Sequence, residues 1–349
     1  MIESLLSLML ALFLVWISMP FARWIGSRLE IVDYPNPRKM HQQAIPCSGG
    51  VAIYLAFFIS LFLVLSIAPH LYQEIGSKVI MLSSLGALLL LLGIYDDKRN
   101  IGAQWKLLGQ IAICLVAIGM GFRIDILSNP FGGAFHLGWL TIPISLFWFL
   151  GFINAMNLID GLDGLATGII AITSLILLPI ALVSGSVDFS ILIAALAGVT
   201  LSFLRINLSQ KGKVFLGDNG SMLLGFLLAS LAIIGSRKGL VFNVLIITFL
   251  CLGVPVYDTA TAITRRLRRG LNIFSPDKEH IHHRLLSYGF NKRKAVLVLF
   301  AMTLVLGLIG IVLTFSRNSG ATAIIIASGS IIAFIKRKWW IDLLKRIMR

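Results

Sequence analysis

The sequence predicts an all-α fold, a polytopic integral-membrane helical bundle of about 11 transmembrane helices. Of its 349 residues 58% are hydrophobic and only 13% are charged, whereas about a quarter of the residues of a soluble domain are charged. The apolar residues fall in blocks of roughly 16 to 20, about the length with which a helix crosses ~30 Å of hydrocarbon. Cations gather on alternate loops, as they do in helical membrane proteins.

Eleven apolar blocks follow one another, and each is predicted to form one span of a single membrane domain over residues 1–349. They are residues 3–19, 49–68, 78–95, 105–122, 139–156, 165–184, 190–206, 220–235, 241–258, 295–315 and 321–335. The first block carries Glu3 and no cation before it, whereas Arg23 and Arg28 follow it. A signal peptide has the opposite order of charge, so we interpret this block as an uncleaved first span.

The charges of the loops predict the orientation of the bundle. The loops of one side are about 20–48, 96–104, 157–164, 207–219 and 259–294, followed by the tail 336–349. With the flanking Lys106 and Arg205 they hold 25 of the 30 Lys and Arg residues. Because cytosolic loops are rich in these cations, we predict an N-terminus outside and a cytosolic C-terminus. The loops would then face the cytosol from an inner (plasma) membrane.

Charge and cysteine content limit the classes of partner. The net charge of +15 suits anionic lipid headgroups and an anionic substrate. Nucleic-acid binding is the other interpretation of a basic chain, but we favour the membrane and expect no nucleic-acid partner. Cys47, Cys114 and Cys251 are isolated, so neither a disulfide framework nor a cysteine zinc site is predicted.

The first polar element of the predicted cytosolic face is the pair Asp96 and Asp97, where the third span enters the cytosol. Adjacent carboxylates at a membrane boundary repel one another and are costly unless a positive charge lies nearby. Lys106, at the start of the next span, is a cation that could face the same site. The structural alternative is a hydrophilic stop after a span.

The second element is the run Asn154–Gly164, which joins two predicted spans. Asp160 and Asp163 are three residues apart, so on a helical turn they would share a face. Gly161 and Gly164 let the backbone approach a ligand closely. Because the run opens the sixth span, free amides and the positive end of the helix dipole could face an anion. A simple helix cap accounts for one aspartate but not for this combination.

The third element, Phe215–Ser221, again places a carboxylate, Asp218, beside glycines at the start of a span. Alone it is compatible with a turn and a cap. Together with the other two elements it completes a cluster of hard oxygen ligands. Such a cluster suits Mg²⁺, which binds one or two carboxylates together with waters and substrate phosphates. Mn²⁺ is the alternative ion.

The fourth element is the longest predicted cytosolic loop, which contains Arg265–Arg269 and Ser275–Arg284. Three histidines in four residues suggest zinc, but no cysteine lies nearby and the neighbouring cations would repel a metal. Donation to phosphate or sugar oxygens is the better use of these side chains. For the arginine run alone we favour a positive-inside anchor. The segment Asp33–Gly50 is by itself only a basic loop that ends at a glycine-rich helix start.

Together, the four elements resemble the polyprenyl-phosphate N-acetylhexosamine-1-phosphate transferases, which form glycosyltransferase family 4. The resemblance runs from about residue 33 to 290. Within the superfamily the chain is most similar to bacterial undecaprenyl-phosphate GlcNAc-1-phosphate transferases that start O-antigen, enterobacterial common antigen or teichoic acid synthesis. That closer match lies in residues 38–50, 213–221 and 275–283. The branch that transfers phospho-MurNAc-pentapeptide is less similar around the histidines.

The resemblance also implies roles for individual residues. Asp218 matches a Mg²⁺ ligand and Asn157 a second metal-side position. Asp96 and Asp97 match the acidic pair near the reacting phosphates, and Lys106 matches a lysine that holds the donor diphosphate. The remaining candidates are the catalytic-cluster residue Asp160, the uridine contacts Asp163, Phe215 and Asn207, and the donor sugar-phosphate contacts Arg265, His280, His282, His283 and Arg284.

The reaction expected from this resemblance is metal-assisted phosphoryl transfer from a UDP-N-acetylhexosamine, with UDP-GlcNAc favoured, to undecaprenyl phosphate. Asp97 or Asp96 could take the proton of the lipid phosphate, and a double displacement through an aspartate is the open alternative. Another UDP-N-acetyl-deoxyhexosamine is the alternative donor. A different class of protein, a transporter of an anionic solute, would need polar residues along a path through the bilayer. A homodimer stays open.

Overall fold

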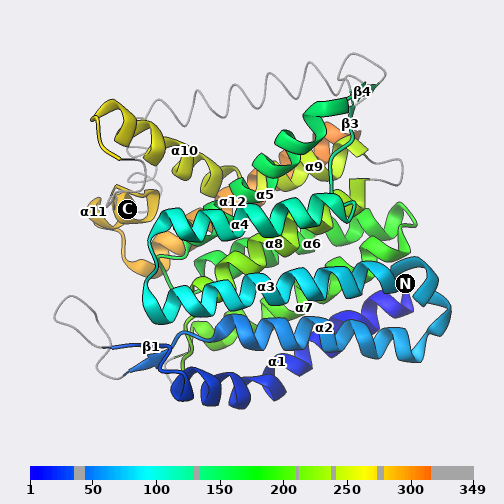
Figure 1. Ribbon diagram of the computed structural model, residues 1–349, viewed down its shortest axis with the longest axis horizontal. Coiled ribbons are helices and arrows are strands. Elements are labelled where there is room, and N and C mark those ends of the chain that lie inside the picture. The colour runs from blue at the N-terminus through cyan, green and yellow to red at the C-terminus, as the bar shows by residue number, and fades with distance from the viewer. Residues whose placement is uncertain (35–43, 129–133, 210–211, 237–240, 273–278, 316–349) are drawn as a thin grey trace.

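Helices dominate the computed structural model, which describes residues 1–34, 44–128, 134–209, 212–236, 241–272 and 279–315 (Figure 1). In chain order they are α1 (Ile2–Arg28), α2 (Gly49–Ile67), α3 (Ser77–Arg99), α4 (Ala103–Gly119), α5 (Thr141–Ile159), α6 (Leu165–Val183), α7 (Val187–Asn207), α8 (Gly217–Ser236), α9 (Val241–Cys251), α10 (Gly253–Arg268), α11 (Ile281–Ser287) and α12 (Lys292–Phe315). Two antiparallel ribbons accompany them, β1 (Val32–Asp33) with β2 (Ile45–Pro46) and β3 (Ile126–Ser128) with β4 (Ala134–His136). The predicted all-α class is confirmed.

Eight of the described helices are long and apolar enough to cross a membrane, namely α1, α2, α3, α5, α6, α7, α8 and α12. The pair α9 and α10 is bent by 63° and becomes a ninth span if it crosses as one unit. Helix α4, with 17 residues, is shorter. Ten of the eleven predicted blocks fall on these helices, and the block 321–335 lies outside the described residues. The number of crossings and their orientation stay predictions.

The structure corrects several predicted ends of spans. Helix α1 continues to Arg28, α3 to Arg99 and α10 to Arg268, so parts of the predicted loops 20–48, 96–104 and 259–294 are helical. The last of these loops also contains α11. Hydropathy locates the edge of the lipid, but a helix can continue past it. Basic side chains extend to the headgroup region and are favourable near a helix C-terminus.

Helix α8 is the centre of the bundle. Its residues from Asn219 to Ser236 are all buried, and it packs against α2, α3, α5 and α9. A Cβ on Gly93 of α3 would lie 2.3 Å from Cα of Asn219, and a Cβ on Gly50 of α2 would lie 2.5 Å from the nitrogen of Gly220. Small residues permit such close contact between membrane helices. The first turn of α8 is therefore held against the end of α3 and the start of α2.

The β1–β2 ribbon is joined to the segment before α8. The ribbon pairs Val32 with Pro46 in antiparallel register. The Pro46 carbonyl accepts a hydrogen bond from the Phe215 amide at 2.9 Å, and the Phe215 carbonyl accepts one from the Gly49 amide at 3.0 Å. These bonds hold Phe215 at the same end of the bundle as the C-terminus of α3.

Candidate active site

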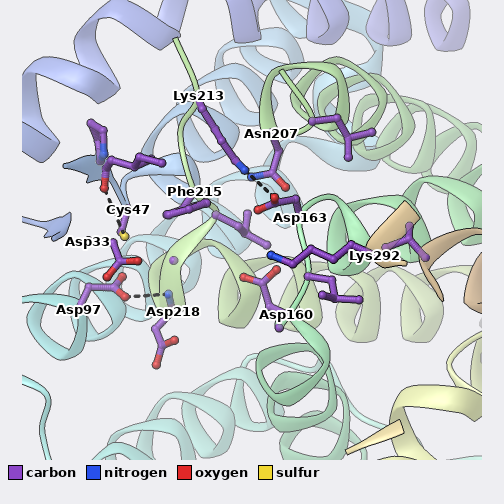
Figure 2. A pocket seen from close by; sticks show the side chains of 18 of the residues that line it. Asp33, Cys47, Asp97, Asp160, Asp163, Asn207, Lys213, Phe215, Asp218 and Lys292 are labelled. Carbon is purple, nitrogen blue, oxygen red and sulfur yellow. Dashed lines mark hydrogen bonds and ion pairs between the residues drawn. The ribbon is translucent and has the colours of Figure 1, made fainter. Parts of the chain in front are cut away.

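A cleft of about 1730 Å³ opens at one end of the bundle (Figure 2). Its walls come from the last turns of α1, α3, α5 and α7, the first turns of α8 and α12, and the turn between α5 and α6. Segments that were predicted to be cytosolic therefore meet in one place. The predicted site residues that line the cleft are Asp97, Asn157, Asp160, Asp163, Asn207, Phe215 and Asp218.

Lys106 of α4 does not itself line the cleft, but it contacts residues of three other helices, two of which, Asn157 and Asp218, do. Its ammonium lies 2.7 Å from Oδ2 of Asp96, donates to Oδ1 of Asn157 at 3.1 Å, and pairs with Oδ2 of Asp218. Asn157 in turn donates to Oγ of Ser221 at 3.0 Å. Oxygens from α3, α5 and α8 thus converge on one positive atom. We name Asp96, Lys106, Asn157 and Asp218 the Lys106 cluster.

The oxygens of the Lys106 cluster fit a hard divalent cation. The ammonium is a cation held by two carboxylates and one amide oxygen, and these are ligand types that Mg²⁺ takes from proteins. Over the part of the chain that the structure describes, no group of three or more His, Cys, Asp or Glu side chains is arranged to hold a metal. Mg²⁺ beside substrate phosphates usually has one or two carboxylate ligands from the protein, together with waters.

Asp97 contacts the start of α8, whereas its neighbour Asp96 contacts Lys106. Its Oδ1 accepts the amide of Asp218 at 2.9 Å, and its Oδ2 accepts the amide of Asn219 at 3.0 Å and the Asn219 side chain at 2.5 Å. The first amides of a helix lack partners within the helix and carry its positive dipole end. Asp97 therefore caps α8 from a neighbouring helix and fixes the backbone of Asp218.

The turn between α5 and α6 corrects one prediction. Asp160 and Asp163 do not share a helical face, because α5 ends at Ile159 and α6 begins only at Leu165, after Gly164 with a φ of +76°. Both carboxylates still line the cleft. Free amides were expected where the sixth span opens, but the amide of Gly164 donates to Oδ1 of Asn207 at 2.5 Å.

Asp160 has an unusual electrostatic environment. Burial raises the pKa of its carboxyl well above the ordinary value, and the negative charges of Asp218, Asp163 and Asp97 raise this pKa further. The charged form of Asp160 is therefore disfavoured at this place in the cleft.

The predicted uridine contacts gather around a lysine that the sequence analysis did not select. Lys213 pairs with Oδ2 of Asp163 at 2.5 Å, and its ammonium lies 4.9 Å from the centre of the Phe215 ring. The side-chain amide of Asn207 donates a hydrogen bond to the carbonyl of Val214, in the same segment, at 2.9 Å. The signal that could have selected Lys213 is its place in the sequence, as a cation two residues before Phe215. Figure 2 shows Lys213, Asp163 and Phe215 on one side of the cleft.

The histidine segment is organised by a second residue that the sequence analysis missed. Asp258 of α10 is 3% exposed, and its carboxylate contacts Nδ1 of His280 at 3.0 Å and accepts the Ile281 amide at 2.9 Å. Glu279 lies 3.8 Å from the guanidinium of Arg265. A lone carboxylate inside an apolar block was the signal for Asp258, because such groups are rare in membrane helices.

His282 connects the histidine segment to the cleft. It is 2% exposed, and a Cβ on Gly161 would lie 2.3 Å from its Nε2. Burial lowers the pKa of His282 to about 4, and the charge of His283 lowers it further against the opposing effect of Asp258. His282 is therefore neutral near pH 7. The five predicted donor-phosphate residues Arg265, His280, His282, His283 and Arg284 are not among the described residues that line the cleft.

The fold is that of a helical integral-membrane protein with charged residues beside a cleft at one end. The comparisons with known proteins identify its family. The sequence profile of glycosyl transferase family 4 matches residues 79–236. The chain is 34% identical over 314 residues to a probable undecaprenyl-phosphate N-acetylglucosaminyl 1-phosphate transferase of Bacillus subtilis (strain 168), with 90% of this chain and 86% of that protein covered.

Two further relatives are also named as polyprenyl-phosphate N-acetylglucosamine phosphotransferases. A decaprenyl-phosphate N-acetylglucosaminephosphotransferase of Mycobacterium leprae (strain TN) is 32% identical over 348 residues, with 90% of this chain and 86% of that protein covered. The undecaprenyl-phosphate alpha-N-acetylglucosaminyl 1-phosphate transferase of Escherichia coli (strain K12) is 29% identical over 303 residues, with 85% and 80% covered. The chain belongs to glycosyl transferase family 4, and the predicted family and transferase class are confirmed.

Proposed function

We propose that this enzyme transfers an N-acetylhexosamine-1-phosphate, with GlcNAc-1-phosphate favoured, from a UDP-sugar to undecaprenyl phosphate. An oxygen of the lipid phosphate attacks the β-phosphorus, the bond from that phosphorus to the bridging oxygen breaks, and UMP leaves. The product, a polyprenyl-diphosphate sugar, would start a cell-envelope polysaccharide. The names of the three relatives, all N-acetylglucosaminyl phosphate transferases acting on a polyprenyl phosphate, support this choice.

The Lys106 cluster is the observation that carries the proposal. Phosphoryl transfer requires alignment of the phosphates and neutralisation of charge on the transferred group. Lys106 is the cation in this cluster, and turning from Asp218 to a diphosphate would exchange one anionic partner for another. Bound Mg²⁺ would supply further charge neutralisation, with Asp218, Asn157 and Asp96 as the residues that would hold it.

The other cleft residues divide into positioning and binding roles. Asp97 fixes the amide of Asp218, so it acts mainly by positioning. Asp163 and Phe215 form the surface for the uridine. A general base is not required near pH 7, because the second pKa of a phosphate monoester is about 6. A double displacement through a covalent aspartyl intermediate is the alternative mechanism.

The test uses membranes that contain the full chain, radiolabelled UDP-GlcNAc, undecaprenyl phosphate and Mg²⁺. We expect organic-soluble label and equimolar UMP, both lost with EDTA and in Asp218→Asn. Transfer from a different UDP-N-acetyl sugar alone would keep the reaction and change the donor. Folded protein that transfers from no UDP-sugar would reject the proposal and favour the anionic-solute transporter.

We also propose that the cleft faces the cytosol of a bacterial inner membrane. UDP-sugars are made and kept in the aqueous cytosol, whereas a long isoprenoid stays in the hydrocarbon of the membrane. The two substrates therefore meet at the cytosolic boundary. Cysteine labelling of an exposed residue on each side, such as Lys98 at the cleft end and Tyr72 at the other end, would test this orientation in intact cells. Labelling of the Lys98 position by an impermeant reagent from outside would contradict it.

A further inference from the structure

The histidine segment, residues His280–His283, is packed beside the cleft and does not line it. His280 and His282 are 6% and 2% exposed. No residue of this described segment is among those that line the cleft, whereas Gly161 of the turn between α5 and α6 is. Figure 1 shows α11, which begins within the segment, at the end of the bundle that carries β1. The segment therefore meets the cleft through the residues on which it packs.

The ring of His282 occupies the space beside Gly161. A Cβ on Gly161 would lie 2.3 Å from Nε2, 2.6 Å from Cε1 and 3.1 Å from Cδ2 of this ring, and these are its three nearest atoms. Carbon atoms in good contact are about 3.5 to 4.0 Å apart, so the methyl group of an alanine has no room here. The φ of Gly161 is not positive, so its backbone conformation suits any residue. The glycine is therefore required by the histidine ring and not by the backbone.

Asp258 of α10 holds the start of the histidine segment. One carboxylate oxygen lies 3.0 Å from Nδ1 of His280, and the other accepts the Ile281 amide at 2.9 Å. Ile281 is the first residue of α11, so its amide has no acceptor within that helix. A buried carboxylate is costly without partners, and here both oxygens have one. Because α10 packs on α5 and α12, Asp258 connects the segment to the bundle.

We propose that Asp258 and His282 are positioning residues of the donor site: they hold the turn between α5 and α6, and with it Asp160 and Asp163, in place from outside the cleft. The rings of His280 and His282 are parallel, with centroids 5.9 Å apart, so a chain of contacts runs from Asp258 to Gly161. Asp160 precedes Gly161, Asp163 follows shortly after it, and both line the cleft. The inference rests on the proposed function, in which Asp163 contacts the uridine.

Direct contact of the histidines with the donor sugar is the competing interpretation. Nδ1 of His282 is buried, and the ring edge that carries Nε2 faces Gly161, so the ring serves as a packing surface. The two interpretations differ in which ligands they affect. A lost sugar contact weakens the binding of the UDP-sugar alone. A displaced turn weakens the binding of every ligand that carries the uridine, including UMP.

The first experiment compares Gly161→Ala with Gly151→Ala in the full chain. A Cβ on Gly151 of α5 meets nothing within 4 Å, so this control adds the same methyl group without a clash. We expect Gly161→Ala to raise the KM for the UDP-sugar and the inhibition constant of UMP by the same factor, about tenfold. The KM for undecaprenyl phosphate should not change, and Gly151→Ala should behave as wild type.

The second experiment removes the ring that the added methyl group meets. In Gly161→Ala/His282→Ala the methyl group enters the space of the imidazole, so we expect this double variant to bind UMP more tightly than Gly161→Ala. His282→Ala alone removes the support of the turn and should weaken UMP binding about two- to fivefold. Equilibrium binding of radiolabelled UMP to the purified proteins gives all three values without turnover.

The third experiment tests whether Asp258 belongs to the same chain of contacts. Asp258→Ala removes both acceptors, whereas the amide of Asp258→Asn can accept the Ile281 amide and donate to Nδ1 of His280. We expect UMP binding to weaken about fivefold in Asp258→Ala and to stay near the wild-type value in Asp258→Asn. Asp258→Ala/His282→Ala should bind UMP no more weakly than the weaker single variant, because both residues act through one contact.

The outcomes keep the two proposals apart. Folded wild-type protein that transfers from no UDP-sugar would reject the proposed function. Normal wild-type transfer, with a raised KM for the UDP-sugar but unchanged UMP binding in His282→Ala, would assign His282 to the sugar and overturn only the positioning role. Additive effects of Asp258→Ala and His282→Ala would overturn it too. So would a Gly161→Ala/His282→Ala variant that binds UMP no better than Gly161→Ala.

Discussion

Two buried lysine–aspartate contacts lie at opposite ends of α3, and their difference separates structure from function. At the start of the helix, Lys78 pairs with Asp188 of α7 at 2.5 Å, and Ser186 donates to the other carboxylate oxygen at 2.8 Å. The Asp188 side chain is only 3% exposed. At the end of α3, one lysine is shared among three oxygens, and the side chain of Asp218 is 38% exposed beside a cleft.

The comparison shows that a buried charge pair is not by itself a sign of activity. In the Lys78 pair, both carboxylate oxygens of Asp188 have partners and its side chain is 3% exposed, so this carboxylate is closed to a ligand. The Lys106 cluster has one cation for two carboxylates and one amide oxygen, and two of its members line a cleft. A metal ion bound there could neutralise the excess negative charge. Exposure and unequal numbers of donors and acceptors distinguish the two sites.

The largest expected effect is the loss of transfer in Asp218→Asn. The substitution keeps the shape of the side chain but removes the charge that Lys106 and a metal would share. We expect kcat to fall about 100- to 1000-fold, the range for removing one key electrostatic group from an active site. The transfer assay measures it, and a matched Asp188→Asn variant should keep its kcat. Equal loss of activity in both variants would remove the distinction between the two sites.

The next effect concerns stability at the other end of α3. Asp188→Asn leaves the partly buried Lys78 without its anion, and breaking a buried pair costs about 3 kcal/mol or more. We expect a lower midpoint of thermal unfolding in detergent with an unchanged KM for both substrates. The double variant Lys78→Met/Asp188→Leu should be more stable than the single one, because it removes both charges. A double variant that is no more stable would show that Asp188 acts through other contacts.

A third prediction concerns His282 and pH. Its pKa falls from 6.5 to about 4 in the folded chain, so the unfolded state binds more protons between these two values. Stability should therefore be complete above pH 6.5 and decline as the pH falls through 4, by about 3 kcal/mol in all. Thermal unfolding of wild type and His282→Gln across this range tests it. Parallel pH profiles would show that His282 is not the titrating group.

Much of the fold was predictable because long apolar runs determine membrane helices almost alone. The bend between α9 and α10 was not, since a hydropathy window over 241–258 averages across a 63° change of direction. Gly253 and Pro255 mark the bend in the sequence, and both residue types interrupt helices. Helix ends were also missed, because charged turns at the membrane boundary remain helical, as α10 does to Arg268.

The sequence predicts that the three acidic segments meet on one side of the membrane, but it does not give the individual contacts between distant residues. The aspartates of the 96–97, 157–163 and 215–221 segments do converge at one cleft, apart from Asp96, which reaches it through Lys106 and Asp218. The bonds from Asp258 to His280 and from Lys213 to Asp163 span 22 and 50 residues, and no spacing rule gives such pairs. The role of Asp97 as a cap for α8 likewise depends on the packing of two helices.

Lys213→Gln should give the smallest effect and sharpen the boundary between the two kinds of lysine contact. The side chains of Lys213 and Asp163 are 21% and 38% exposed, so water screens their attraction, and such pairs contribute about 0.2 to 1 kcal/mol. If Lys213 orients Asp163 and the Phe215 ring for the base, the KM for the UDP-sugar rises about two- to fivefold while kcat is unchanged. Lys98→Gln, which removes an exposed cation outside the cleft, is the control for charge. A fall in kcat as large as that of Asp218→Asn would instead place Lys213 with Lys106, among the groups that act on the reacting phosphates.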